Sequence, residues 1–230
     1  MITQEMTPQR DFVLEKKEYE KSEKDRESIE NDNVLLNTNY VLFEQSERCD
    51  KIIEIICGKV KLGFYDHFGN CCIVALYGKG DFLGHLALIN RDRHDFFAVV
   101  AEKDTMIRSI SIKQAKHKMQ VDVEFSTKIN KQIVRDISLF RKSLEILFCN
   151  DTEARLIQFL KNLKEQYGEL RAKGYYMHHN LTQSDIASAI GSSRKTTSLL
   201  MNQLEERGDI SYSRSHIFFP LNSRCNKLIA

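Results

Sequence analysis

The sequence predicts an α+β protein in which an antiparallel β-barrel is followed by a long helix and a winged helix-turn-helix. Three observations support this class. Short apolar stretches alternate with turn residues up to about residue 112, an apolar helical repeat follows up to 148, and a helix-turn-helix pattern occupies 181–207. Regularly spaced short strands are typical of antiparallel sandwiches and barrels. We therefore expect a charged segment at 1–33, the barrel at 34–120, the long helix at 121–149 and a C-terminal domain at 150–230.

The composition of the chain limits the number of domains and shows how charge is distributed among these segments. The chain has 230 residues, 42% of them hydrophobic, and a formal net charge of +2, which is enough apolar material for one or two domains. Segment 1–33 is acidic, with six Lys/Arg against ten Asp/Glu, whereas 150–230 is mildly basic, with eleven against eight. Because no signal peptide and no membrane-length apolar run is found, we expect a cytoplasmic protein with no membrane partner.

Motifs for metal binding and catalysis are absent from the sequence. Six cysteines occur without a CxxC pair, so a zinc ribbon or thioredoxin-like site has no support and we expect no metal site. Reduced thiols are the default in a cytosolic protein. Since no Ser-His-Asp pattern, Walker loop, HExxH or paired-carboxylate motif stands out, we do not expect an enzyme.

The barrel is predicted from short apolar stretches that turn signals separate. Turn residues at 58–59, 66–70 and 78–81 break the apolar pattern. The expected strands are 40–43, 52–57, 60–65, 71–77, 96–101 and 106–110.

A helical repeat takes over after residue 111. Its apolar positions step by 4, 4, 3, 4 and 3 residues, which is the coiled-coil signature and predicts a homodimer. The predicted seam is Ile129, Ile133, Ile137, Phe140, Leu144 and Leu147. The flanking positions are charged: Arg135, Asp136, Arg141, Lys142 and Glu145. The alternative is a core helix lying on its own barrel.

The stretch 181–207 reads as two helices around a tight turn. Thr182 and Asp185 are spaced as a capping box, and Gly191 suits a left-handed turn residue. Ser192 or Ser193 is expected to cap the second helix. Its buried stripe is predicted at Thr197, Leu200, Met201 and Leu204.

The outward face of the second helix indicates nucleic-acid binding. It carries Arg194, Lys195, Ser198 and Asn202, and polar donors on the first turns of a second helix are what a major-groove reader needs. Two short strands around residues 213–215 predict a β-hairpin wing placed to touch the DNA backbone. The alternatives are an ordinary helical hairpin with a solvated face and an interaction module that does not read DNA.

Three stretches in this order resemble one family. The stretch IIEIICGKVKLGFY covers 52–65, GKGDFLGHLAL covers 78–88, and the winged helix-turn-helix follows. Together they are similar to the CRP/FNR transcription regulators from about residue 34 onward. The resemblance implies a jelly-roll barrel like that of cyclic-nucleotide-binding domains, which would sense an effector. It also implies a homodimer on near-palindromic double-stranded DNA and RNA polymerase as a partner.

The resemblance also assigns roles within the helix-turn-helix. The family's phosphate-contacting positions match Thr182, Gln183, Ser193 and Thr196. Arg194 matches the arginine that reads guanine, with Ser198 beside it on the same face. Lys195 stands where many relatives have Glu, and Leu199 where they have a later Arg. We therefore expect a half-site that differs from those of these relatives.

The effector pocket is expected at Gly84, His85, Leu86 and Ala87, the glycine-rich turn and short helix of the barrel. Cyclic-nucleotide binders have a Glu for the ribose at the position of His85. Their phosphate-binding Arg falls at His94 or Asp95, and Arg91 or Arg93 could replace it only if the loop shifts. These differences disfavour cAMP, because a carboxylate repels phosphate.

The positions of the cysteines and histidines bear on the other cofactors of the family. No cysteine precedes Cys49, which disfavours the family's N-terminal iron–sulfur cluster. Haem remains possible, and the candidate axial ligands are His67, His85, His94 and His117. Another small molecule, or no ligand at all, is also compatible with the sequence.

Overall fold

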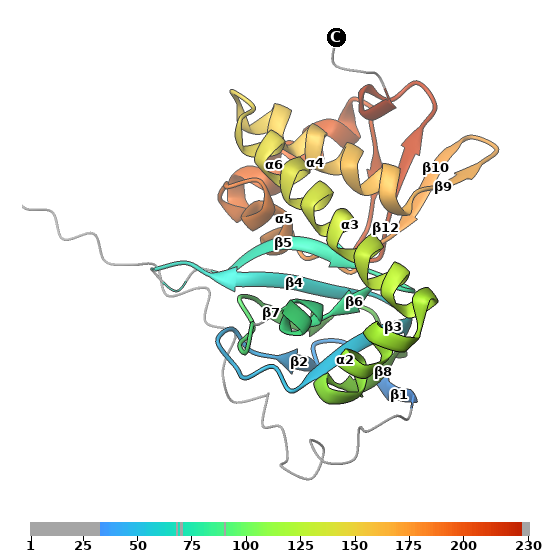
Figure 1. The fold of residues 1–230 in the computed structure, drawn as a ribbon. Coiled ribbons are helices and arrows are strands. Elements are labelled where there is room, and N and C mark those ends of the chain that lie inside the picture. Colours follow the sequence, from blue (N-terminus) through green and yellow to red (C-terminus); the bar gives the residue numbers. More distant parts are fainter. Residues whose placement is uncertain (1–32, 68, 70, 90, 227–230) are drawn as a thin grey trace, which may run out of the picture.

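The computed structural model describes residues 33–67, 69, 71–89 and 91–226, and it consists of a β-sandwich, a long helix and a C-terminal α/β unit (Figure 1). The charged segment predicted at 1–33 lies outside the described residues except for Asn33. Within the described part, no helix is both long and apolar enough to cross a membrane.

Two antiparallel sheets of four strands each form the sandwich. One sheet has the order β1-β8-β3-β6 and the other β2-β7-β4-β5. Their strands are β1 (Asn33–Leu36), β2 (Val41–Phe43), β3 (Lys51–Cys57), β4 (Val60–Tyr65), β5 (Cys71–Tyr77), β6 (Phe82–Leu83), β7 (Phe97–Val100) and β8 (Thr105–Ser111). The predicted strands are thus confirmed, with β1 and β6 added.

The sandwich is jelly-roll-like, although its sheets do not close into a continuous barrel. Successive side chains of β3 point to opposite faces of its sheet, and both faces are buried. Ile53 and Ile55 point into the core between the sheets, whereas Ile52 packs with Phe82 under the helices. A strand covered on both faces reads as an apolar run rather than as an alternating pattern.

Two helices follow β8, where the sequence predicted one helical stretch. Helix α2 spans Ile112–Val121 and begins at a capping box between Ser111 and Gln114. Helix α3 spans Val123–Leu147 and begins at Asp122, whose side chain accepts a hydrogen bond from the backbone N–H of Phe125. Asp122 has an extended backbone, so it ends α2 and caps α3 at the same point.

Helix α3 has an inner and an outer seam, and the predicted dimer seam combined residues from both. An inner seam faces the sandwich and the C-terminal unit and contains Phe125, Ile129, Gln132, Asp136 and Ile146. Ile129 is 1% exposed and therefore belongs to the core of its own protomer, not to a dimer contact as predicted. Ile133 packs against the same cluster, and Phe140 stacks on Phe96 with ring centroids 5.6 Å apart.

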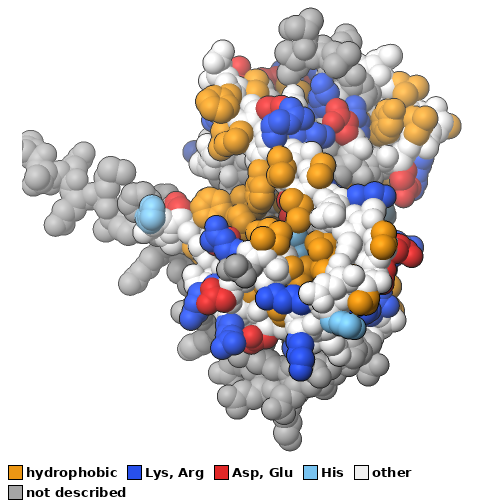
Figure 2. All heavy atoms as spheres, viewed as in Figure 1, with side chains coloured by type: hydrophobic (Ala, Val, Ile, Leu, Met, Phe, Trp, Pro, Cys, Tyr) orange, Lys and Arg blue, Asp and Glu red, His pale blue; other side chains and the backbone are white. Residues whose placement is uncertain are grey.

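The outer seam of α3 is solvent-exposed, and its apolar residues are spaced by 11, 3, 7 and 4 positions, which keeps them close to one side of the helix. Its apolar members are Val123, Val134, Ile137, Leu144 and Phe148, with exposures from 56 to 83%. Figure 2 shows apolar side chains across the middle of the face that carries α3. Of the predicted seam, Ile137 and Leu144 lie on this face, and Leu147 is also exposed.

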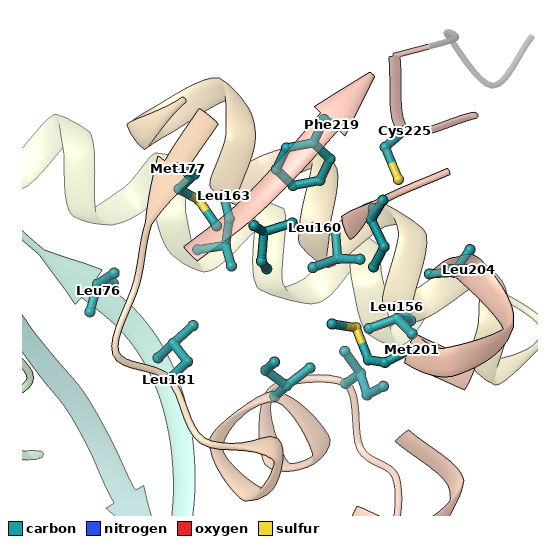
Figure 3. Close-up of a cluster of buried hydrophobic side chains, with 14 of the residues drawn as sticks. Leu76, Leu156, Leu160, Leu163, Met177, Leu181, Met201, Leu204, Phe219 and Cys225 are labelled. Atoms are coloured by element: carbon teal, nitrogen blue, oxygen red, sulfur yellow. The ribbon is translucent and has the colours of Figure 1, made fainter. Parts of the chain in front are cut away.

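The C-terminal unit packs around one apolar cluster (Figure 3). Its elements are α4 (Thr152–Tyr167), β9 (Glu169–Arg171), β10 (Gly174–His178), α5 (Gln183–Ala189), α6 (Arg194–Glu206), β11 (Ser211–Tyr212), β12 (His216–Pro220) and the 3₁₀ turn η3 (Arg224–Asn226). The strands form an antiparallel sheet of order β11-β12-β10-β9. Leu76 of β5 and Ile146 of α3 belong to the same cluster, so the unit shares its core with the sandwich and the long helix.

Candidate nucleic-acid interface and effector cavity

Local hydrogen bonds fix the two helices of the helix-turn-helix. The Thr182 hydroxyl accepts from the Asp185 N–H at 3.1 Å, and the Asp185 carboxylate accepts from the Thr182 N–H at 2.8 Å. Gly191 has φ +60°, a left-handed conformation that glycine adopts without strain. Ser193, rather than Ser192, caps α6 by accepting from the Thr196 N–H at 3.1 Å. The predicted caps and turn are thus confirmed.

Helix α6 divides cleanly into a buried and an exposed face. Thr197, Met201 and Leu204 are fully buried, and Leu200 is partly buried against the same cluster. Arg194, at the first position of the helix, and Lys195 are exposed, Ser198 is half-buried, and Leu199 is 57% exposed. A cationic first turn with an apolar residue beside it offers donors for base edges and a contact for a thymine methyl group.

The predicted outward residue Asn202 is engaged within the protein. Its side-chain oxygen accepts a hydrogen bond from the Tyr212 hydroxyl at 2.7 Å, which ties α6 to strand β11 of the wing. The wing itself is confirmed as the β11–β12 hairpin with the turn at 213–215.

The four predicted phosphate-contacting residues differ in accessibility. Thr182, Ser193 and Thr196 are exposed. Gln183 is half-buried, and its side-chain oxygen is inaccessible and accepts no hydrogen bond from the described residues. In this conformation the Gln183 carbonyl therefore faces the protein rather than solvent.

Helix α5 docks on strand β5 of the sandwich, a contact that sequence reasoning missed. The Ser188 hydroxyl donates to the Cys71 carbonyl at 2.7 Å and accepts from the Ile73 N–H at 2.9 Å. Lys61 and Asp185 form an ion pair at 3.0 Å, with side chains 11% and 13% exposed. Helix α5, which precedes α6, is thus held by the sandwich of the same chain.

Aromatic and imidazole rings gather on the C-terminal sheet. Tyr176 stacks on His216 at 5.2 Å, and the Arg171 guanidinium lies 4.1 Å from the Tyr176 ring centre. His179 is buried, and its Nδ1 accepts from the Leu181 N–H at 3.2 Å. Burial, together with the nearby Lys59 ammonium, lowers the pKa of His179 to about 4. His179 is therefore neutral at physiological pH.

A small cavity of about 60 Å³ opens in the sandwich beneath α3. Gly84, His85, Leu86 and Ala87, the predicted effector residues, all line it. The short 3₁₀ helix η2 (His85–Ile89) carries three of them. From the other walls come Tyr77 of β5, Phe140 of α3 and the loop residues 93–96. The expected pocket residues are therefore brought together, with α3 as an additional wall.

The cavity contains a buried polar network centred on Asp136. Its carboxylate accepts from the Tyr77 hydroxyl at 2.9 Å and from the Gln132 amide at 2.7 Å. His85 Nε2 lies 3.0 Å from the other carboxylate oxygen. Sequence reasoning placed Asp136 on a solvated flank, but it is only 9% exposed. Burial, followed by the Asp136 charge, raises the pKa of Tyr77 above its usual range.

The histidines and the thiol of the cavity are poorly suited to bind iron. His85 faces the Phe82 carbonyl at 3.2 Å with Nδ1 and Asp136 with Nε2, so coordination would break one of these contacts. His94 stacks on Phe43 with centroids 3.6 Å apart. Burial raises the pKa of Cys49 to about 11, which keeps this thiol protonated. His67 and His117 are exposed and do not line the cavity.

The loop at 91–95 differs from the sequence expectation in one respect. Arg93, His94 and Asp95 all line the cavity, so Arg93 reaches the wall that was expected to hold His94 or Asp95 alone. Its guanidinium donates to the Ser46 carbonyl at 2.7 Å. Arg91 instead pairs with Asp95 at 3.4 Å. The cavity therefore combines one arginine with two carboxylates, Asp95 and Asp136.

Sequence comparisons place the chain among transcription regulators. The Crp-like helix-turn-helix domain family matches residues 154–220. The chain is 25% identical over 170 residues to the cAMP-activated global transcriptional regulator CRP of Salmonella typhimurium, covering 74% of this chain and 80% of that one. It is 27% identical over 180 residues to the global nitrogen regulator of a Nostoc species, covering 78% and 81%.

Solved structures share the whole fold. FixK2 from Bradyrhizobium japonicum matches with a TM-score of 0.70 at 18% identity, covering 84% of this chain and 93% of that one. A CooA mutant from Carboxydothermus hydrogenoformans matches with a TM-score of 0.67 at 18% identity, covering 82% and 83%. The order of sandwich, long helix and helix-turn-helix is therefore common to these proteins.

Proposed function

Because this chain belongs to the CRP/FNR family of transcription regulators, we propose that it binds a near-palindromic operator as a homodimer and reads its sequence with helix α6. The observation that carries this proposal is the outward face of α6. Arg194 and Lys195 lie exposed in its first turn, and Ser193 fixes where that turn begins. This is the part of a recognition helix that enters the major groove.

Each exposed side chain has a distinct expected role. Arg194 is the candidate for bidentate hydrogen bonds to a guanine edge, and Leu199 for contact with a thymine methyl group. Thr182, Ser193 and Thr196 are placed to meet phosphates, which sets the docking position rather than the sequence. Gln183 joins them only if α5 moves away from its present surroundings.

The outer seam of α3 is the proposed dimer interface. A twofold axis along this seam would bury Val134, Ile137 and Leu144, which are now 64%, 63% and 56% exposed. Contiguous apolar residues of this kind on a soluble protein mark an interaction surface. Two recognition helices related by this axis would meet successive major grooves about 34 Å apart.

Selection of bound sequences from random duplex DNA tests the reading function. We expect enrichment of an inverted repeat with half-sites one helical turn apart. Enrichment should require Arg194, so the Arg194→Ala variant is the matched comparison. Recovery of sequences without a common half-site would contradict the proposal.

Charge on the outer seam should abolish dimerisation. The double variant Ile137→Lys, Leu144→Lys places like charges across the proposed axis, and sedimentation should show monomers. Leu170→Lys is the control, because Leu170 is 66% exposed on β9 and lies away from α3. A double variant that remains dimeric would place the interface elsewhere.

The sandwich cavity is the proposed effector site, and we propose that cAMP is not its ligand. His85 stands where cyclic-nucleotide binders have their ribose-binding Glu, and the Asp95 and Asp136 carboxylates would oppose a phosphate. The curated relatives named as cAMP-activated are only 25% identical to this chain. Calorimetric titration with cAMP and cGMP tests this point, and a micromolar dissociation constant would overturn it.

A further inference from the structure

One arginine lies where the end of α3, the start of α4 and the end of α5 meet. The Arg155 guanidinium donates through Nε to the Ile190 carbonyl at 2.8 Å, and Ile190 is the C-cap residue of α5. One terminal nitrogen donates to the Thr152 hydroxyl, at the start of α4, at 3.0 Å. The other makes a longer contact of 3.5 Å with the Cys149 carbonyl, just beyond the cap of α3. A single side chain therefore joins three helices.

The Arg155 guanidinium meets helix ends rather than a carboxylate. Its acceptors are two backbone carbonyls and one hydroxyl, and none of the ion pairs among the described residues includes it. The last carbonyls of a helix have no partner within the helix, and that end carries a negative partial charge. Arginine offers several donors in one plane, whereas lysine offers a single compact ammonium. The shape of the Arg155 side chain, and not only its charge, therefore suits this position.

The turn after α5 is short, so the Ile190 carbonyl lies close to the start of α6. Only residues 191 and 192 separate Ile190 from Ser193, the N-cap of α6. The Ser192 N–H donates back to the Ala187 carbonyl at 2.9 Å, which restricts the turn further. A guanidinium that holds the end of α5 therefore also holds the beginning of the recognition helix.

The same turn borders the last residue of α3. A side-chain carbon placed on Gly191 would lie 3.6 Å from Leu147 Cδ2, which is an ordinary van der Waals distance. Arg155 adds a polar contact from the same end of α3 through the Cys149 carbonyl. These contacts link the helix that carries the proposed dimer seam to the turn that precedes α6.

We propose that Arg155 is a positioning residue that sets the separation of the two α6 helices in the dimer, and thereby the half-site spacing that the protein accepts. This inference rests on the proposed dimer and operator. With a twofold axis along the outer seam of α3, the placement of each α6 against its own α3 decides how far apart the two α6 helices lie. One extra base pair shifts a half-site by about 3.4 Å and turns it by about 35°. A firmly held α6 therefore rejects an altered spacer, whereas a loosely held α6 follows the displaced half-site.

Operators that differ only in spacer length test this proposal. The selected inverted repeat is compared with copies whose spacer is one base pair shorter or longer. We expect the natural protein to lose affinity by about tenfold or more on either altered operator, because one α6 no longer meets its groove. Arg155→Met should lose no more than about threefold on the same operators, because its α6 can adjust. Equal spacing discrimination by the two proteins would overturn the proposal.

Two further variants separate the clamp from its charge. Arg155→Lys keeps the charge but lacks the planar set of donors, so it should relax spacing discrimination nearly as much as Arg155→Met. Arg108→Met is the matched control, because it removes the same charge from an ion pair with Glu54 on the sandwich. It should discriminate spacers as the natural protein does. Natural discrimination in Arg155→Lys would assign the effect to charge and overturn the clamp.

A duplex with one half-site shows whether the variants still read DNA. A single half-site makes no demand on spacing, so Arg155→Met should bind it with nearly natural affinity and keep the base preference that depends on Arg194. Loss of half-site binding by both Arg155 variants would contradict a role in spacing.

Hydrogen exchange without DNA tests the clamp independently of the operator. The Gly191 and Ser192 amides should exchange several-fold faster in Arg155→Met than in the natural protein, because the turn loses its anchor. Unchanged exchange of these amides would overturn the clamp whatever the DNA result. If the exchange rises but the natural protein binds no inverted repeat, the proposed function fails and, with it, the role of Arg155 in spacing.

Discussion

The inner face of α3 and the outer face of α6 both carry polar side chains, yet these side chains lie in opposite environments. Gln132 and Asp136 on α3 are 4% and 9% exposed, and hydrogen bonds join both to the sandwich. Arg194 and Lys195 on α6 are exposed. A buried carboxylate has lost its hydration and depends on hydrogen bonds from the protein. An exposed cation is hydrated by solvent and needs no partner within the protein. The first arrangement stabilises a fold, and the second is available to a ligand.

The largest effect is expected from breaking the buried network. Asp136→Ala would leave the Tyr77 hydroxyl and the Gln132 amide without their shared acceptor, and it would remove the carboxylate that lies beside His85. We expect a loss of about 3–5 kcal/mol in the free energy of unfolding. Urea unfolding at a fixed protein concentration measures it, with Asp136→Asn as a milder control that keeps one acceptor oxygen. A loss below about 1 kcal/mol would contradict the importance of the network.

The buried imidazole of His179 predicts a dependence of stability on pH. Its folded pKa of about 4 is below the usual 6.5, so the unfolded chain takes up the proton first. The contribution of neutral His179 to the free energy of unfolding is fully present above pH 6.5 and is lost as the pH falls toward 4. The loss amounts to about 3 kcal/mol. Lys59, His178 and His216 face the same group and disfavour its charging.

Urea unfolding at pH 7 and pH 4.5 tests this expectation. The variant His179→Asn keeps an acceptor for the Leu181 N–H but removes the titrating ring. Its stability should therefore change less between the two pH values than that of the natural protein. Identical pH dependence of both proteins would assign the effect to other groups.

On the exposed side, Arg194→Ala should affect binding rather than folding. We expect a loss of about 1–3 kcal/mol in operator affinity and a relaxed preference at one base position. The free energy of unfolding should change by no more than about 0.5 kcal/mol, as is usual for surface substitutions. Binding titrations on selected and scrambled DNA distinguish a sequence-specific loss of affinity from a general one. An unchanged base preference would remove Arg194 from the reading surface.

The smallest effect is expected for Lys195. If Lys195 contacts a phosphate, Lys195→Ala weakens binding to all DNA sequences alike. It also reduces the slope of log affinity against log salt concentration by about one unit. Lys116→Ala on α2 is the matched control, because Lys116 is also an exposed lysine on a helix. A sequence-selective loss in Lys195→Ala would instead place this residue at a base edge.

Local signals explain why the helix-turn-helix was predicted well. Its caps at Thr182 and Ser193 and its turn at Gly191 depend on residues no more than a few positions apart. The strands of the sandwich were equally visible because turn residues bound them. The docking of Ser188 on β5 was not visible, since the residues it joins are 115 and 117 positions apart.

The inner seam of α3 shows a different reason for failure. A search for apolar residues passes over Gln132 and Asp136, although both occupy core positions, and joins Ile129 to the exposed Ile137 and Leu144 instead. The partners that make a buried carboxylate acceptable, Tyr77 and His85, come from distant segments. Periodicity alone therefore could not separate the face that packs inward from the face that remains free.

The contact between Ser188 and β5 has a consequence for aggregation. Strand β5 is the last strand of its sheet, and an uncovered last strand presents backbone groups that pair with other chains. Ser188 occupies the Cys71 carbonyl and the Ile73 N–H, and the Tyr167 hydroxyl donates to the Leu76 carbonyl. The C-terminal unit thus shields the sandwich from edge-to-edge association, and a fragment that ends before α4 should self-associate through β5.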